Sequence, residues 1–297
     1  MRIDNPQLGL ARVCRLFGIT RQAYYNYKKR TEKKYLENDQ VLKMVKAIRE
    51  VHPRIGCRKI YTILKDDFEH MKIKIGRDKL FDLLSDNQLL IRKRKRRIRT
   101  TNSHHSFRKY KNIIKNFIPY KANQLWVSDI TYLKKGETFS YLFLITDAYS
   151  KKILGYNLAE TLETKNAIIS LRMAIDSSES TEGIIHHSDR GLQYCSRNYV
   201  KLLQDYKIEI SMTEDSKPTD NSIAERVNGI LKEEYIEPLK KSSNYDLAEV
   251  IDQAVLRYNN YRPHMSCDMM TPKQAHHSEG ILRKRWKNYY PIQQVNH

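Results

Sequence analysis

The sequence lacks any apolar run long enough to cross a membrane. Spanning a bilayer takes about 20 mostly apolar residues, whereas the longest unbroken apolar run covers only residues 141–145. The first residues carry no apolar, signal-type stretch. Cysteine is scarce as well, because the 4 cysteines are scattered and form no Cys-x-x-Cys pair. This argues against a zinc finger and against a disulfide framework. We therefore expect a cytoplasmic protein with reduced thiols and no membrane partner.

Acidic residues are few compared with basic ones. The chain of 297 residues has 34 Asp and Glu against 54 Lys and Arg, a net charge of +20. Residues 1–118 hold 31 basic and 11 acidic side chains, and residues 119–297 hold 23 of each, so the whole excess lies in the first part. Such an excess raises the local concentration of polyanions. At about 150 residues per domain, the length also suggests two domains.

A run of cations stands near the end of the basic part. Its members are Arg92, Lys93, Arg94, Lys95, Arg96 and Arg97. A polar stretch follows, so residues 92–118 are expected to form an extended basic linker. Six neighbouring cations repel one another and are neutralised best by phosphates, which favours contact with DNA. A linker that is merely solvated is the alternative.

Residues 1–35 predict a helix-turn-helix module. Apolar positions repeat at helical spacing up to Phe17, the pattern breaks at Gly18, and it resumes after Thr20, which can cap the second helix. That helix would expose Arg21 to phosphates and base edges. A helical pair that packs and binds nothing is the alternative that these residues leave open.

Residues 36–91 predict a second module of the same kind. Apolar positions at helical spacing fall in three stretches, with a short joint at residues 54–56. The cations Arg54, Arg58 and Lys59 flank the hydrophobic positions instead of occupying them. A DNA-facing surface requires this arrangement, so we expect the three to contact DNA.

The sequence changes character from residue 119 onward. Runs rich in β-branched and aromatic residues predict strands, and stretches with helical apolar spacing predict helices between the later ones. The predicted order is strands at 125–133, 140–146 and 153–158, a helix at 165–176, a strand at 183–187, a helix at 197–206 and a strand at 208–212. Strands first and alternation afterwards imply a mixed sheet with packed helices, an α+β or α/β fold. We assign residues 119–240 to this core and residues 241–297 to a C-terminal helical extension, and expect the core to fold without residues 1–118.

Three acidic residues stand at the edges of these elements. Asp129 lies in the first strand, Asp189 follows the fourth strand, and Glu225 lies in a helix that begins near Ser222. Functional groups gather where strands end, and converging carboxylates bind Mg²⁺ while leaving positions open for phosphate and water. Two such ions can serve phosphoryl transfer. The alternative is that Ser222 and Glu225 form only a capping box.

The helix of Glu225 is expected to turn a polar face toward the acid pair. On a helical wheel, Asn221, Glu225, Asn228 and Lys232 lie opposite the apolar positions. Lys232 would then meet a DNA phosphate, with Asn221 and Asn228 as further DNA contacts.

Several motifs resemble a known family. Thirty-five residues separate Asp189 from Glu225, and Lys232 follows seven positions later, which resembles the D,D(35)E signature of retroviral-integrase-type transposases. The sequence motifs around these residues and near the end of the chain are Trp126-Val-Ser-Asp129-Ile-Thr131, His187-Ser-Asp189-Arg-Gly191, Asp220-Asn221 and Tyr258-Asn-Asn-Tyr-Arg262-Pro-His264. In this order they resemble the orfB product of the type-three bacterial insertion-sequence family, over nearly the whole chain. Arg226 departs from the family pattern, in which a small or hydroxyl residue is usual.

The resemblance implies a ribonuclease H-like core with Asp129, Asp189 and Glu225 as catalytic triad and metal ligands. It implies Mg²⁺ as cofactor, as two ions for which Mn²⁺ substitutes, and cleavage at terminal inverted repeats followed by strand transfer. The site offers no obvious Ser-His nucleophile pair, which agrees with in-line displacement at phosphorus without a covalent intermediate. The implied partners are double-stranded DNA of element ends and target, further copies of the chain on DNA, and a fused upstream-frame product, in the bacterial nucleoid.

Other functions stay open on the residues alone. A non-catalytic DNA-binding regulator derived from a transposase is the main alternative, and a nuclease that only hydrolyses is another. His186 and His187 could suggest zinc, but no second ligand pair has zinc spacing, so we expect them to pack at the strand end. Arg262 and His264 either touch DNA or stabilise the closing loop.

The charge distribution predicts a steep salt dependence of DNA binding by the N-terminal region. Each phosphate contact releases condensed counterions, so affinity falls with rising salt. Equilibrium binding of the full chain to duplex DNA, measured at several salt concentrations, should show this fall. An affinity that does not change with salt would contradict it.

Overall fold

The computed structural model describes residues 9–91, 107–135, 137–214, 221–242 and 246–285. The predicted DNA contacts at residues 92–97 lie outside this part of the chain. The chain divides into two compact units, Met1–Glu50 with Leu64–Leu90, and Val51–Ile63 with Ile91–His297. Each unit is described by itself.

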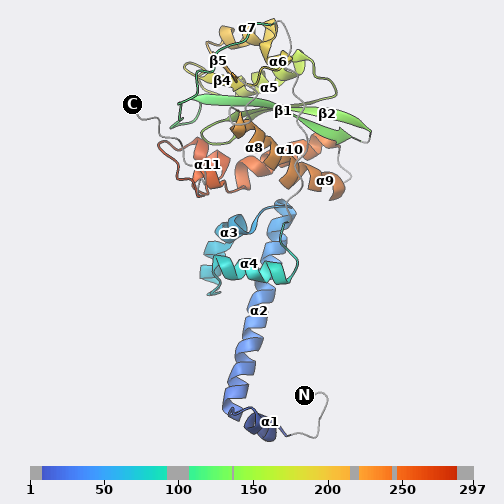
Figure 1. Cartoon of the computed structure of the whole chain (residues 1–297), viewed down its shortest axis with the longest axis vertical. Coiled ribbons are helices and arrows are strands. Elements are labelled where there is room, and N and C mark those ends of the chain that lie inside the picture. The colour runs from blue at the N-terminus through green and yellow to red at the C-terminus, as the bar shows by residue number, and fades with distance from the viewer. Residues whose placement is uncertain (1–8, 92–106, 136, 215–220, 243–245, 286–297) are drawn as a thin grey trace. The chain divides into compact units, whose positions relative to one another are not determined.

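In the described residues, four helices precede the sheet, whereas the sequence predicts two helical stretches up to residue 35 and three after it. They are α1 (Leu10–Leu16), α2 (Arg21–Val51), α3 (Cys57–His70) and α4 (Arg77–Asp86) (Figure 1). Gly18 ends the first helix with a φ of +65°, a backbone conformation that favours glycine. The hydroxyl of Thr20 accepts a hydrogen bond from the Ala23 N–H at 3.0 Å, so the predicted cap is formed.

Helix α2 is longer than the sequence suggests. It runs for 31 residues without a break across the predicted module boundary at residues 35 and 36. Its polar middle has neither glycine nor proline, and ion pairs one turn apart support it. These pairs are Lys28 with Glu32, Lys33 with Glu37, and Asp39 with Lys43. A polar helix stabilised by such pairs needs no apolar stripe, which is why apolar periodicity failed to show its continuity.

Five strands form one mixed sheet, which confirms the predicted strands. They are β1 (Leu125–Lys135), β2 (Thr138–Asp147), β3 (Ile153–Ala159), β4 (Ile185–Ser188) and β5 (Glu209–Met212), in the order β3-β2-β1-β4-β5. Strands β1, β2 and β3 pair antiparallel. Strand β4 pairs parallel to β1, and β5 parallel to β4. The place where the sheet changes from antiparallel to parallel pairing is therefore the β1–β4 boundary.

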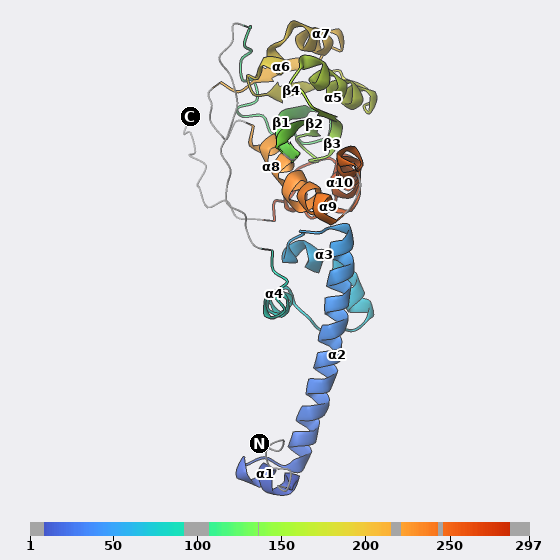
Figure 2. The same ribbon diagram turned by 90° about the vertical axis from the view of Figure 1, so that its right-hand side faces the viewer.

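Helices cover both faces of the sheet (Figures 1 and 2). On one face lie α5 (Thr164–Asp176), α6 (Leu192–Cys195) and α7 (Arg197–Asp205), and on the other α8 (Ser222–Ile230), the π-helical turn η1 (Leu231–Ile236), α9 (Glu237–Ser242) and α10 (Leu247–Tyr261). The 3-10 turn η2 (Met265–Cys267) and α11 (Pro272–His276) follow. Phe143 and Ile145 of β2 join the first apolar core, whereas Leu142 and Leu144 join the second, as the alternation of a strand requires.

The core extends beyond its predicted limits on both sides. Upstream, the Met212 N–H donates to the Lys111 carbonyl at 3.4 Å, the Ile113 N–H donates to Ser211 Oγ at 3.2 Å, and Tyr110 packs on the first apolar core. Downstream, α10 supplies much of the second apolar core, so it is not an extension. A deletion of residues 1–118 would therefore remove contacts of the core itself. The sequence had suggested that the core folds without these residues.

Within the described residues, no helix combines the length and the apolar character needed to span a membrane.

Gly155 of β3 is required by close packing against α5. A Cβ atom at this position would lie 2.0 Å from the Ser170 carbonyl oxygen and 2.9 Å from the Ala174 nitrogen. Both are backbone atoms of α5 and cannot move alone. Gly155→Ala is therefore expected to lower the free energy of unfolding by about 3 kcal/mol, the upper part of the range for overpacking.

Chemical denaturation measures this loss, and Gly229→Ala in α8 is the matched control. A Cβ at Gly229 meets no atom within 4 Å, so alanine there should stabilise the helix by up to about 1 kcal/mol. Equal unfolding midpoints for the two variants would contradict the close approach of α5 to β3.

Candidate active site

Three carboxylates approach one another from three elements. Asp129 lies on β1 and Asp189 directly follows β4. The last parallel pair of these strands is Val127 with His187, so the two aspartates each come two residues later and lie on one side of the sheet. Glu225 lies in the first turn of α8, a helix that contacts β1.

The electrostatic environment of Asp129 includes the two other carboxylates. Burial, followed by the negative charges of Asp189 and Glu225, raises the pKa of Asp129 to about 7. Hydrogen bonds from the Asn228 side chain and the Ile130 N–H act in the opposite direction. The structure therefore brings the predicted acids within electrostatic reach of one another.

The donor set fits a divalent cation by its chemistry. Three carboxylates in partial contact with solvent offer the hard oxygen ligands that Mg²⁺ prefers, and a cation would relieve their mutual repulsion. In the described part of the chain, no three His, Cys, Asp or Glu side chains are gathered closely enough to enclose an ion. The carboxylates are thus neighbours without being at ligand spacing.

Two buried asparagines fix α8 against β1. The Asn228 amide donates to Asp129 Oδ2 at 2.8 Å, and the Asn221 amide donates to the Ser128 carbonyl at 2.8 Å. Lys232 Nζ donates to the Tyr132 carbonyl. The polar face of this segment therefore turns toward the acids, as expected. The side-chain nitrogens of Asn221, Asn228 and Lys232, however, donate hydrogen bonds to atoms of β1.

The capping-box alternative for Glu225 is wrong. Asn221 occupies the N-cap of α8, and its side chain makes no capping hydrogen bond. Ser222 is already inside the helix and exposed. Ser222 and Glu225 therefore do not form a capping box at the start of α8.

Gly191 positions Asp189. Its N–H donates to Asp189 Oδ1 at 3.0 Å, and a Cβ atom on Gly191 would lie 2.9 Å from the same oxygen. A Cβ atom at this position would require the Asp189 carboxylate to shift. The Asp-Arg-Gly motif is the sequence signal of this turn.

Both histidines of β4 are buried below the acids. His186 Nε2 lies 2.5 Å from Ser128 Oγ and 3.0 Å from the Tyr199 hydroxyl, and His187 Nδ1 lies 2.8 Å from Ser211 Oγ. Burial lowers the pKa of His186 to about 3, with a smaller effect from His187. The Ser128–His186 contact is a Ser-His pair that the sequence did not reveal, but both side chains are inaccessible, so it packs the sheet.

A second charged cluster was missed by sequence reasoning. Arg262, only 2% exposed, forms a two-pronged pair with Glu234 (Nε to Oε2 2.8 Å, Nη2 to Oε1 2.9 Å), and Lys59 Nζ lies 3.5 Å from Glu234 Oε1. Lys59 is thus a half-buried partner of Glu234, whereas a DNA contact was expected. Of the two alternatives for Arg262, contact with DNA or stabilisation of the closing loop, the burial and the ion pair favour the second. Sequence separations of 175 and 28 residues leave no local signal.

The side chains of the other predicted DNA contacts are at least partly exposed. The side chains of Arg21 and Arg58 are exposed, and that of Arg54 is half-buried.

Comparison with known proteins identifies the core. The family model described as "Integrase core domain" matches residues 119–218, and a second model with the same description matches residues 206–272. Over 264 residues the chain is 30% identical to the "Insertion element IS600 uncharacterized 31 kDa protein" of Shigella sonnei, covering 88% of this chain and 96% of that protein.

Shorter matches are found with named transposases. The chain is 33% identical over 153 residues to the "Putative transposase for insertion sequence element IS986/IS6110" of Mycobacterium tuberculosis, covering 50% of this chain and 55% of that protein. It is 31% identical over 160 residues to "Transposase InsF for insertion sequence IS3A" of Escherichia coli, covering 54% and 56%. The solved HTLV-2 integrase catalytic core domain in complex with magnesium aligns with 54% of this chain and 100% of its own, at a TM-score of 0.45 and 22% identity.

The chain therefore belongs to the insertion-sequence transposases that carry an integrase core domain. This confirms the resemblance read from the motifs, and the structure confirms the predicted mixed-sheet core preceded by helices. The protein is an enzyme of the polynucleotidyl transferase class, its function is transposition, and an integrase core implies the use of divalent metal.

The Glu234 cluster makes a stability prediction. Although burial alone would raise the pKa of Glu234, Arg262 and Lys59 outweigh it and lower the pKa. A lowered carboxyl pKa contributes stability that is complete above the pKa of the unfolded chain and is lost as pH falls through the folded value. Glu234→Gln, which leaves Arg262 buried without its counter-charge, should lower the free energy of unfolding at pH 7 by about 3 kcal/mol.

The matched control is Glu233→Gln, whose side chain is exposed and whose effect should stay within about 0.5 kcal/mol. Urea unfolding at pH 7 and below pH 4 measures both variants. The difference between wild type and Glu234→Gln should shrink at acid pH, and a difference independent of pH would count against the ion pair.

Proposed function

We propose that this transposase binds the terminal inverted repeats of its insertion sequence and catalyses Mg²⁺-dependent strand cleavage and strand transfer with Asp129, Asp189 and Glu225. The single observation that carries the proposal is the interaction of these three carboxylates at the β1–β4 boundary. They match the acidic signature in order and spacing. Family membership supplies the reaction class.

The three carboxylates would hold the metal. Two Mg²⁺ ions held there would supply activation of the attacking oxygen and charge neutralisation at the leaving one, and Mn²⁺ would substitute for them. With a pKa of about 7 in the absence of metal, Asp129 holds a proton readily, and exchanging that proton for a cation costs little near neutral pH.

Neighbouring groups orient these ligands. The Asn228 amide fixes Asp129 Oδ2, and the Gly191 N–H fixes Asp189 Oδ1. Asn221 ties the start of α8 to β1 and so sets the approach of Glu225. We assign Asn221, Asn228 and Lys232 to positioning within this site, where the sequence suggested direct DNA contact.

Sequence-independent DNA binding is assigned to the basic part. The run at residues 92–97 and the cations Arg21, Arg54 and Arg58 would contact phosphates of element ends and target. The helical segments at residues 1–35 and 36–91 would carry this contact jointly, because α2 belongs to both. Pairing of two element ends requires more than one copy of the chain, and a fused upstream-frame product is a further proposed partner.

The test is a strand-transfer assay with labelled terminal-repeat DNA and Mg²⁺. Asp129→Asn should lower the rate by at least about 100-fold, because loss of a metal ligand removes several kcal/mol of stabilisation from the transition state. Asp176→Asn, at the exposed end of α5, is the matched control and should keep wild-type activity.

Each other outcome assigns a different function. Equal activity of Asp129→Asn and wild type, with comparable circular dichroism, would overturn the assignment of the triad. Nicked but unjoined products from the wild type would favour the nuclease. DNA binding without metal-dependent cleavage would favour the non-catalytic regulator.

A further inference from the structure

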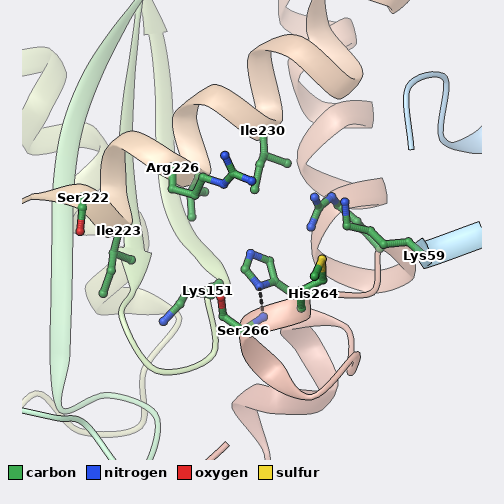
Figure 3. Close-up of a pocket in the computed structure, with 11 residues that line it drawn as sticks. Lys59, Lys151, Ser222, Ile223, Arg226, Ile230, His264 and Ser266 are labelled. Carbon is green, nitrogen blue, oxygen red and sulfur yellow. Dashed lines mark hydrogen bonds between the residues drawn. The ribbon is translucent and has the colours of Figure 1, made fainter. Parts of the chain in front are cut away.

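A cavity lies on the side of α8 opposite the three carboxylates, and several positively charged side chains line it. It measures about 490 Å³, within the range of small-ligand sites. All charged residues that line it in the described part of the chain are cations: Lys59, Lys151, Arg226 and Arg262. Figure 3 shows the imidazole of His264 between Lys151 and Arg226.

His264 supplies an unused donor to this cavity. Its Nδ1 accepts a hydrogen bond from the Ser266 N–H at 3.2 Å, so the ring proton is carried by Nε2. The side chain is only 6% exposed, and Nε2 has no hydrogen-bond partner among the described residues. In Figure 3 this edge of the ring faces away from Ser266, toward the space below Arg226. A buried donor without an acceptor costs about 1–3 kcal/mol, which an anion in the cavity would recover.

The charges act together on this position. Burial lowers the pKa of His264 well below its ordinary value, and Arg262, Lys151, Lys59 and Arg226 all lower it further. The ring is therefore a neutral donor surrounded by positive potential. Glu234 compensates part of this charge by pairing with Arg262 and Lys59, whereas Arg226 is exposed and ready to meet an anion.

The remaining wall is apolar. Ile223, Val227 and Ile230 line it along one face of α8, and Met265 also lines it. A phosphate alone would leave this wall and most of the volume unused. A ligand with an anionic head and a flat, weakly polar body matches both parts.

We propose that this cavity binds one nucleotide, with its phosphate held by His264 Nε2–H and the surrounding cations and its base packed on the apolar wall of α8. The phosphate belongs either to the 5′ end of a DNA strand or to a free nucleotide. The DNA source rests on the proposed function, whereas the binding of a nucleotide phosphate does not.

Titration calorimetry on the full chain tests the proposal with 2′-deoxyadenosine 5′-phosphate, and with deoxyadenosine as the probe without phosphate. The nucleotide should bind and the nucleoside should not. Arg226→Gln should weaken nucleotide binding about tenfold, the loss expected for one charge-assisted contact. The matched control is Arg172→Gln, an exposed arginine of α5, which should bind as the wild type does.

A second pair of variants tests the donor. His264→Phe removes Nε2–H and keeps a flat ring, so it should weaken nucleotide binding about tenfold. His264→Gln offers an amide donor at nearly the same distance from the backbone and should recover part of the affinity. Circular dichroism checks folding in each case, and Arg226→Gln tests the proposal even if both His264 variants unfold.

Oligonucleotides distinguish the two sources. If a 5′-phosphorylated strand binds more tightly than its 5′-hydroxyl twin in the wild type, and equally in Arg226→Gln, the ligand is a DNA end. If both strands bind equally while the mononucleotide binds, the ligand is a free nucleotide. No binding of the mononucleotide, or equal weakening by Arg172→Gln, overturns the proposal. Asp129→Asn should retain mononucleotide binding, so failure of the catalytic assignment is seen separately.

Discussion

The hydrogen bond from Asn228 to Asp129 joins residues that are 99 positions apart and holds α8 on the sheet. It acts where three negative charges meet under partial burial, a combination that would otherwise push the helix away. The Asn221 amide makes a second tie from the same helix to the same strand, across 93 positions. Because both amides donate to oxygen atoms of β1, they set the helix position. The hydrogen bond from Asn228 also lowers the pKa of Asp129, against burial and the neighbouring negative charges, which raise it.

Helix α8 separates two regions of opposite charge. Glu225 and Asn228 face the carboxylates, whereas Ile223, Arg226, Val227 and Ile230 line the cationic cavity. The latter four are spaced as one helix face. The proposed metal site and the proposed nucleotide site thus lie on opposite sides of one helix, whose diameter is about 10–12 Å. Both would contact the negatively charged phosphates of a nucleotide chain.

The catalytic unit is built from more of the chain than the family core. Residues 107–118 add hydrogen bonds and an apolar contact to the edge of the sheet at β5. Upstream, His52 Nδ1 lies 2.8 Å from the Tyr235 hydroxyl, and Lys59 joins Glu234 and Arg262. Thus the segment Val51–Ile63 belongs to the same compact unit as the sheet, although it lies far before it in the sequence.

The sequence by itself determined the strands and most helices, because these depend on local periodicity, and its motif spacing singled out the three acids that we propose as the catalytic triad. It also located the polar face of the Glu225 helix. Tertiary structure alone decided that Lys59 and Arg262 share Glu234, that Asn228 and Lys232 serve β1, and that α10 completes the core. Such contacts join residues dozens to hundreds of positions apart, and no periodicity records them. Apolar periodicity missed the continuity of α2 for another reason. Ion pairs stabilise the polar middle of this helix, which therefore has no apolar stripe.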